Sequence, residues 1–221
     1  MCKNNASKNV KYDELKNDFK EKFLAEVNNP QKYNYDFLAD LPKNATLEGY
    51  LYPDTYFIYA DSTPETIIRK MLDNFGKKVT KDIREQAKSK NMTLNQVLTM
   101  ASIIQKEVKT PEEMKLAAGL YFNRLNANKA LESDSTITYV TGNYDSRAST
   151  EDLKIKSPYN TYTHNGLPPG PISNPSLIAI TAVLNPTESD YMFFITDKSG
   201  KAIFSVTGEE HVENVEEHLN N

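Results

Sequence analysis

One short stretch, ASIIQKEV at residues 101–108, places a carboxylate among apolar side chains. On a helix that turns about 100° per residue, Glu107 falls at the margin of an apolar arc, beside Met100, Ile103 and Ile104. A carboxyl group flanked in this way is partly desolvated, which disfavours its charged form and raises its pKa. A raised pKa suits a general acid near neutral pH, so Glu107 is a candidate catalytic acid. The alternative is a boundary residue in an ion pair with a nearby Lys or Arg.

Residues that support other catalytic chemistries are missing from the sequence or scattered in it. Neither G-x-S-x-G nor S-x-x-K occurs, and the single cysteine, Cys2, lies beside the first residue, so nucleophilic acyl transfer is poorly supported. The histidines, His164, His211 and His218, form no H-E-x-x-H motif, and no Gly-rich phosphate loop occurs. We therefore expect no metal ion and no cofactor.

The composition is typical of a globular protein and excludes several kinds of partner. Of 221 residues, 38% are hydrophobic and 25% are charged, and the formal net charge is -4. The charges are interspersed, so there is no basic patch for nucleic acid. No apolar run approaches the roughly 20 residues that span a bilayer, and no signal-peptide pattern occurs. The polar residues 1–10 are expected to be disordered, and they indicate that the natural protein extends further upstream.

Local signals predict most of the helices. Three helices are expected to begin at threonine caps, which are Thr63, Thr93 and Thr110. Apolar residues four apart predict an amphipathic helix over 11–27, and the segment NPSLIAITAVLNP predicts a short apolar helix. A last helix is expected over 209–219.

Two regions are expected to contain strands. The aromatic residues 46–60, with Gly49 and Pro53, predict a short strand, a turn and then another strand or extended piece, and YMFFIT-DKSG-KAIFSV predicts a β-hairpin. Residues 131–172 are mostly loop-like, and a loop of this length is usually functional when it is ordered. We predict an α+β fold in which helices pack on small antiparallel sheets and leave a long substrate cleft.

Four segments of the sequence carry a resemblance to a known family. They are LEGYLYPDTY at 47–56, ASIIQKE at 101–107, YFNRLNANKALESDSTITY at 121–139 and SPYNTYTHNGLPPGPISNP at 157–175. In this order they resemble the YceG-like (MltG) family of endolytic murein transglycosylases, from about Leu47 to the end of the chain. The resemblance implies that residues 46–221 are the catalytic domain. Residues 1–45 would be a flexible start and a linking helix, the remnant of an upstream LysM-like and membrane-anchor region.

The resemblance implies a reaction that needs one carboxylate. Family members cleave the β-1,4 bond between N-acetylmuramic acid and N-acetylglucosamine inside nascent peptidoglycan strands and leave a 1,6-anhydro end. The family's catalytic glutamate corresponds to Glu107, and Gln105 stands where the family often has a second Glu. Glu107 would protonate the leaving oxygen and then accept a proton from the sugar's own 6-hydroxyl. An ordinary retaining glycosidase needs a second carboxylate about 5–5.5 Å away.

The resemblance also marks candidate substrate-binding residues, which are Glu48, Asn123, Arg124, Asp134, Tyr159, Asn160, Thr161 and Tyr162. Tyrosine faces and amide groups suit sugar rings and acetamido groups. Each has a structural alternative. Arg124 could order the site through a carboxylate, with Asp134 as partner, or it could form a buried structural ion pair. Asp134 could order its loop through backbone hydrogen bonds. The residues at 159–162 could pack and cap a turn, and Glu48 could be a structural carboxylate at a strand end.

Two positions in the C-terminal part were compared with the family's pattern, and only one of them matches it. Ala202 stands where relatives commonly have a histidine in the hairpin, whereas His211 matches a family position. The implied substrate is peptidoglycan glycan strands, at the extracytoplasmic face of the bacterial cell membrane. Penicillin-binding proteins and other cell-wall synthases are implied partners, nucleic acid is not, and the membrane would be reached only through an anchor absent from this chain.

Two other functions remain open from the sequence. A hydrolytic muramidase would need a second well-placed carboxylate, Glu48 or Asp134, and would leave reducing ends. A non-catalytic peptidoglycan-binding or scaffold protein would cleave nothing, and Glu107 would then be dispensable for binding.

Overall fold

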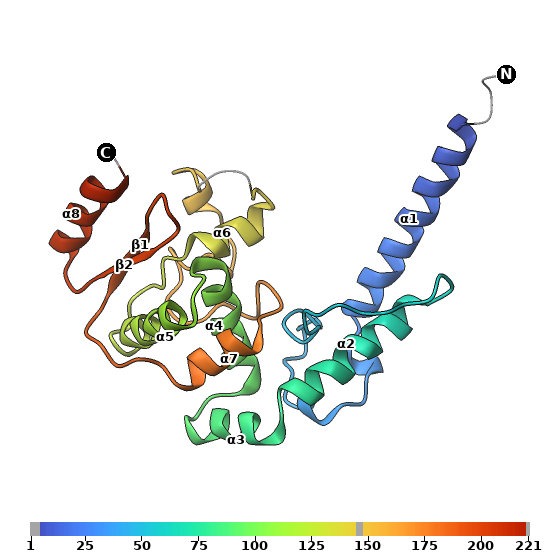
Figure 1. The fold of residues 1–221 in the computed structure, drawn as a ribbon, viewed down its shortest axis with the longest axis horizontal. Helices are drawn as coiled ribbons and strands as arrows, with labels where there is room; N and C mark the ends of the chain where they lie inside the picture. The colour runs from blue at the N-terminus through green and yellow to red at the C-terminus, as the bar shows by residue number, and fades with distance from the viewer. Residues whose placement is uncertain (1–4, 145–147, 220–221) are drawn as a thin grey trace.

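The structure is a computed structural model that describes residues 5–144 and 148–219, with the side chains of the first helix described from Lys16 onward. Its elements are α1 Asn5–Val27, η1 Pro30–Lys32, η2 Asp36–Leu38, α2 Pro64–Lys78, α3 Lys81–Ser89, α4 Leu94–Glu107, α5 Pro111–Asn126, α6 Asp134–Thr141, η3 Asp152–Lys154, α7 Leu177–Leu184, β1 Phe193–Thr196, β2 Ala202–Ser205 and α8 Gly208–Leu219. Figure 1 shows α1 projecting from the rest of the molecule, with the hairpin and α8 at the opposite side. Helices pack with a small two-stranded antiparallel sheet, which confirms the predicted α+β class.

Helix α4 lies at the centre of the fold and is buried over most of its length. It packs against α5 and α7, and these two helices also pack against each other. Its apolar arc accounts for this packing, since Val97 and Ile104 are fully buried. Small polar side chains on its other side, such as Thr99, are buried as well. Thr99 can be buried because its Oγ1 donates to the Asn95 carbonyl of the same helix at 2.7 Å. The last residue of this central helix is Glu107.

The three predicted threonine caps are confirmed. Thr63 Oγ1 accepts a hydrogen bond from Thr66 N at 3.2 Å, and Thr93 and Thr110 both form reciprocal capping boxes. A cap of this kind stabilises a helix by about 1 kcal/mol. The predicted hairpin is also present, with Thr196 paired to Ala202 in antiparallel register. These elements were predictable because their signals lie within a few residues of one another.

Residues 46–60, predicted as a short strand, a turn and then another strand or extended piece, contain no strand in the structure. Gly49 turns the chain at a φ of 89°, and its N–H donates to Asn174 Oδ1 at 2.8 Å. The N–H of Leu51 donates to the same oxygen at 3.0 Å. Since a side chain from a distant segment satisfies these backbone donors, the segment needs no neighbouring strand.

Two helices differ from the prediction. Helix α3 was not predicted, because Lys81–Ser89 offers only Ile83 and Ala87 as apolar residues of a helical stripe, and Thr80 makes no side-chain capping bond. Helix α1 begins at Asn5, inside the stretch expected to be disordered. Residues 1–4 of that stretch lie outside the described residues.

Residues on both sides of the expected domain boundary share one aromatic cluster. The Phe37 and Phe75 ring centroids are 4.9 Å apart, and those of Tyr50 and Phe75 are 5.3 Å apart. Tyr33 is buried in the same core. The segment before residue 46 therefore packs with α2, and the assignment of residues 46–221 as a catalytic unit stays a prediction.

We expect Gly119→Ala to destabilise the protein although the glycine lies inside a helix. An added Cβ would meet the Thr187 carbonyl oxygen at 2.2 Å, where α5 closely approaches the chain that follows α7. Overpacking costs about 1–3 kcal/mol, which outweighs a gain in helix propensity of about 1 kcal/mol. Thermal unfolding measures the difference. Gly208→Ala is the control, since nothing lies within 4 Å of its added Cβ, and equal melting temperatures for both variants would contradict the close approach.

Candidate active site

The carboxyl group of Glu107 lies at the N-terminus of α6 and takes the place of a capping side chain. Ser133 is the N-cap residue of α6, yet its side chain makes no capping bond, and its hydroxyl instead donates to Glu107 Oε1. Oε1 also accepts from the Ser135 N–H at 3.2 Å. Ser135 Oγ lies 2.8 Å from Ser133 Oγ. Both hydrogen bonds that described residues make to this carboxyl group thus end on Oε1, so Oε2 is the oxygen that can meet a substrate.

The surroundings of Glu107 shift its pKa in opposite directions. Burial raises its pKa, and the hydrogen bonds from Ser133 and Ser135 lower it in part. The nearby charge of Asp134 adds to the upward shift. A helix N-terminus also favours a carboxylate, so the site stabilises the anion once the proton has left. A carboxyl group in this balance can both give up a proton and take one back.

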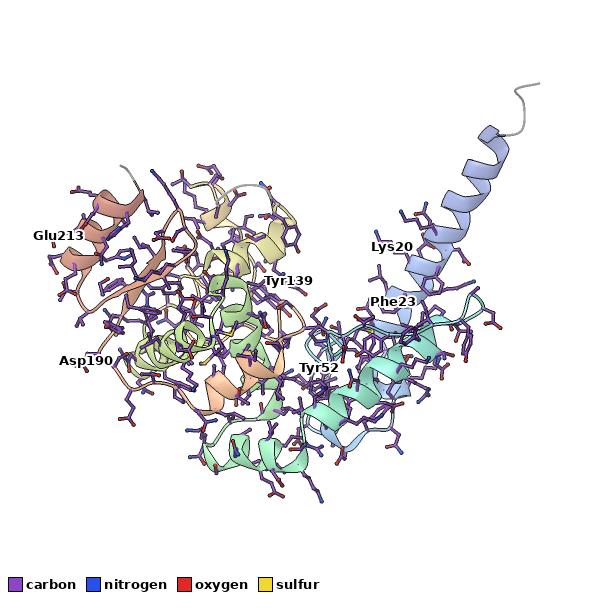
Figure 2. All side chains as sticks on the ribbon, in the orientation of Figure 1. Lys20, Phe23, Tyr52, Tyr139, Asp190 and Glu213 are labelled. Carbon is purple, nitrogen blue, oxygen red and sulfur yellow. The ribbon has the colours of Figure 1, made fainter. Side chains whose placement is uncertain are left out.

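A cavity of 450 Å³ opens beside Glu107, between α5, α6, the hairpin and α8. This volume lies in the range of about 300–1,000 Å³ found for small-molecule sites. Its polar lining includes Glu107, Tyr121, Arg124, Glu132, Asp134 and Tyr162. Phe193 and Phe194 of β1 supply part of an apolar wall. Figure 2 shows the side chains of these elements gathered in the main body of the molecule. The structure thus brings three predicted substrate-binding residues, Arg124, Asp134 and Tyr162, to the cavity of Glu107.

Arg124 is buried and holds together the backbone around the cavity. Its side chain donates to the carbonyls of Met192 at 2.7 Å, Ala130 at 2.8 Å and Leu131 at 3.3 Å. It also forms an ion pair with Glu132 at 2.7 Å. One guanidinium group therefore joins α5, the segment before α6 and the start of the hairpin.

The expected pairing of Arg124 with Asp134 is wrong, because the partner is Glu132. Glu132 adopts a φ of 51°, and this turn of the chain directs its side chain, rather than that of Asp134, to the arginine. Asp134 is exposed in the first turn of α6 and accepts a hydrogen bond from Tyr162 Oη at 2.5 Å. The Tyr162 ring is thereby fixed at the cavity.

Asn160 and Thr161 lie behind the cavity wall and are buried. Asn160 Nδ2 donates to two backbone carbonyls of the 153–155 segment, and its Oδ1 accepts from Tyr162 N at 2.9 Å. Thr161 Oγ1 accepts from Ser133 N at 3.0 Å. These bonds hold Tyr162 and Ser133, the two residues that meet Asp134 and Glu107.

The other three predicted residues are not part of this cavity. Asn123 Nδ2 donates to the carbonyls of Ser189 at 2.7 Å and Tyr191 at 3.0 Å, which anchors the chain leading to the hairpin. Glu48 and Tyr159 lie in a separate cluster. This cluster also contains Tyr139.

Sequence reasoning did not select Ser133, Ser135 or Tyr121 as site residues, although all three lie in the quoted segment 121–139. Tyr121 lies in α5 and is buried. Its hydroxyl and His211 Nδ1 are buried and without a hydrogen-bond partner among the described residues, and both residues line the cavity. Burial lowers the pKa of His211, as does the charge of Arg124. Ala202 lies outside the cavity lining, while its strand partner Thr196 belongs to it.

Residues 5–144 and 148–219 contain no group of three or more His, Cys, Asp or Glu side chains that could hold a metal ion. Within the same ranges, every helix falls short of the length and apolar character needed to cross a membrane.

The chain is similar in sequence to proteins named as endolytic murein transglycosylases. An endolytic murein transglycosylase from Streptococcus pneumoniae is 36% identical over 229 aligned positions, which cover 94% of this chain and 41% of that protein. A second from Bacillus subtilis is 36% identical over 166 positions, covering 75% of this chain and 46% of that protein. The chain thus spans less than half the length of these relatives.

A solved structure and a family profile agree with this similarity. The crystal structure of a yceG-like protein from Listeria monocytogenes superposes with a TM-score of 0.74 at 36% identity, over 87% of this chain and 63% of that one. The profile of the YceG-like family matches residues 3–217. The chain is therefore a member of the YceG-like family.

Proposed function

We propose that the chain is the catalytic part of an endolytic murein transglycosylase, with Glu107 as general acid and then general base. The observation that carries this proposal is the position of Glu107, a half-buried carboxyl group that caps α6 beside a sugar-sized cavity. The names of the relatives from Streptococcus pneumoniae and Bacillus subtilis support the same reaction.

The arrangement suits a reaction with one acid/base residue. Glu107 Oε2 donates its proton to the glycosidic oxygen as the bond from C1 of N-acetylmuramic acid to that oxygen breaks. The carboxylate that remains is stabilised by the Ser133 hydroxyl, the Ser135 N–H and the N-terminus of α6. It then takes the proton of the sugar's 6-hydroxyl, whose oxygen closes onto C1 to give the 1,6-anhydro end. The apolar wall formed by Phe193 and Phe194 limits the access of water that would otherwise hydrolyse the intermediate.

The remaining predicted residues receive supporting roles in this proposal. Tyr162, fixed by Asp134, offers a ring face to a sugar. Arg124 and Asn123 position the cavity walls through backbone carbonyls. The proposed substrate implies action outside the cytoplasm, and cell-wall synthases such as penicillin-binding proteins stay predicted partners.

Mass spectrometry of digests of nascent, uncrosslinked glycan strands tests the proposal. Muropeptides with 1,6-anhydro ends are the expected products. Reducing ends would instead identify a hydrolytic muramidase, the second candidate, which Asp134 favours because it lines the same cavity as Glu107. Binding of strands without any product would indicate a scaffold protein.

We expect Ser133→Ala to move the falling, alkaline limb of kcat/KM to higher pH. The Ser133 hydroxyl lowers the pKa of Glu107, so its removal raises that pKa and keeps the acid protonated to higher pH. The pH dependence of glycan cleavage measures this shift. Ser135→Ala keeps its backbone N–H at Oε1 and should shift the limb less. An unmoved limb in Ser133→Ala would contradict Glu107 as the titrating acid.

A further inference from the structure

A second cluster of carbohydrate-compatible side chains lies outside the cavity of Glu107. Tyr139 of α6 and Tyr159 are half-buried, and their ring centroids are 5.1 Å apart at an interplanar angle of 46°. Figure 2 labels Tyr139 at the side of the main body that faces α1 and α2. Burial raises the pKa of Tyr139 to about 12, and the nearby charges of Tyr159 and Glu48 add to this shift. The charge of Glu48 also raises the pKa of Tyr159, again after burial.

Two close backbone contacts build this cluster. Gly49, next to Glu48, lies so near Pro171 that an added Cβ would sit 2.4 Å from the proline Cγ. Gly170, the residue before Pro171, lies close to Tyr159. A Cβ added to Gly170 would sit 3.3 Å from the Tyr159 hydroxyl oxygen. The 48–51 and 170–174 segments are therefore packed into one surface, on which Glu48 and Tyr159 are held together.

The orientation of the Glu48 carboxyl group is also fixed. Asn174 Oδ1 accepts from two backbone N–H groups, so its Nδ2 must point the other way, where it donates to Glu48 Oε1 at 3.1 Å. Among the described residues, this bond leaves Oε2 of Glu48 available to a ligand. Burial raises the pKa of Glu48, and the charge of Lys106, the residue before Glu107, opposes that shift.

Helix α6 connects this cluster to the reacting residue. Ser135, whose N–H binds Glu107, and Tyr139 are four residues apart and so lie on the same face of α6, about 6 Å apart along its axis. That spacing is comparable to one sugar unit. An enzyme that cuts inside a strand must hold sugars on both sides of the broken bond, and Glu48, Tyr139 and Tyr159 lie outside the lining of the Glu107 cavity.

We propose that Tyr139, Tyr159 and Glu48 form a second sugar-binding subsite, which holds the glycan strand one helical turn along α6 from Glu107. The tyrosine rings stack against the apolar face of a sugar, and Glu48 accepts a hydrogen bond from a hydroxyl or acetamido N–H group. This inference rests on the proposed function, because its ligand is the same strand.

Binding of peptide-free oligosaccharides of alternating N-acetylglucosamine and N-acetylmuramic acid, of two and eight sugars, tests the subsite by calorimetry. The parent is Glu107→Gln, so that nothing is cleaved. In this parent, Tyr139→Leu should weaken binding of the eight-sugar strand about tenfold, which equals about 1.4 kcal/mol, and leave binding of the two-sugar unit, which is too short to occupy both sites, nearly unchanged. Tyr139→Phe keeps the ring and should bind both lengths as the parent does. Tyr59→Leu, at a tyrosine that is 78% exposed on a distant loop, is the matched control.

The outcomes separate this subsite from the proposed function. If the parent binds both lengths and Tyr139→Leu binds them equally well, the subsite is wrong and the proposed function stands. An equal loss for both lengths would also overturn the subsite, since it would show a general disturbance of the cavity. If the parent binds neither length, both proposals fail.

Discussion

Glu107→Gln should lower the rate of glycan cleavage by about 10³-fold while leaving the fold intact, because a positioned acid/base residue contributes about 10²–10⁴-fold. The glutamine carbonyl can still accept from Ser133 and Ser135, so the cap of α6 is kept, but the amide has no proton to give to the leaving oxygen. Liquid chromatography with mass spectrometry of 1,6-anhydro muropeptides measures the loss.

The stability of this variant provides a second check. Burial raises the pKa of Glu107, so the folded state binds its proton more tightly than the unfolded chain does. The folded protein therefore loses stability as the pH rises from the ordinary pKa of a glutamate through the raised value. The neutral glutamine escapes this loss, and at pH 7 the melting temperature should be unchanged or higher.

A matched exchange at an exposed glutamate controls for the chemical change itself. Glu112→Gln, in the first turn of α5, should cleave at the wild-type rate. Full activity of Glu107→Gln would contradict the proposed mechanism. A large fall in its melting temperature would show that Glu107 has a structural role instead.

Arg124→Leu should lower the free energy of unfolding by about 3 kcal/mol, the range for leaving buried polar groups without partners. The change removes the donors of the Met192, Ala130 and Leu131 carbonyls at once. For a protein of this size, each kcal/mol lowers the melting temperature by about 2–4 °C, so we expect a fall of about 6–12 °C by calorimetry. Activity should fall as well, since Leu131 and Met192 line the cavity.

The control for this variant separates the ion pair from the backbone contacts. Glu132→Gln removes the charge that faces Arg124 but leaves every carbonyl contact in place. Because the Glu132 side chain is 47% exposed, the pair should contribute less than about 1 kcal/mol. If Glu132→Gln destabilises the protein as much as Arg124→Leu does, the role assigned to the carbonyl contacts is wrong.

Local chemistry in the sequence determined several elements and the candidate acid. The threonine caps at 63, 93 and 110 and the hairpin turn depend on atoms a few residues apart, so their signals survive in the bare sequence. The position of Glu107 at the margin of an apolar arc follows from helical periodicity alone, and burial indeed raises its pKa. The resemblance then supplied the family, which the profile over residues 3–217 confirms.

The partners of these residues were decided by tertiary structure. Ser133 and Ser135, which bind Glu107, are 26 and 28 residues away from it, and the approach of α4 to α6 depends on packing that no local pattern encodes. The pattern of residues 46–60 is typical of strands, but the side chain of Asn174 accepts from the N–H groups of Gly49 and Leu51. Arg124 meets Glu132 rather than Asp134 because the backbone turns between them. Sequence patterns report the chemistry that a residue can do, whereas its actual neighbours are set by long-range packing and backbone hydrogen bonding.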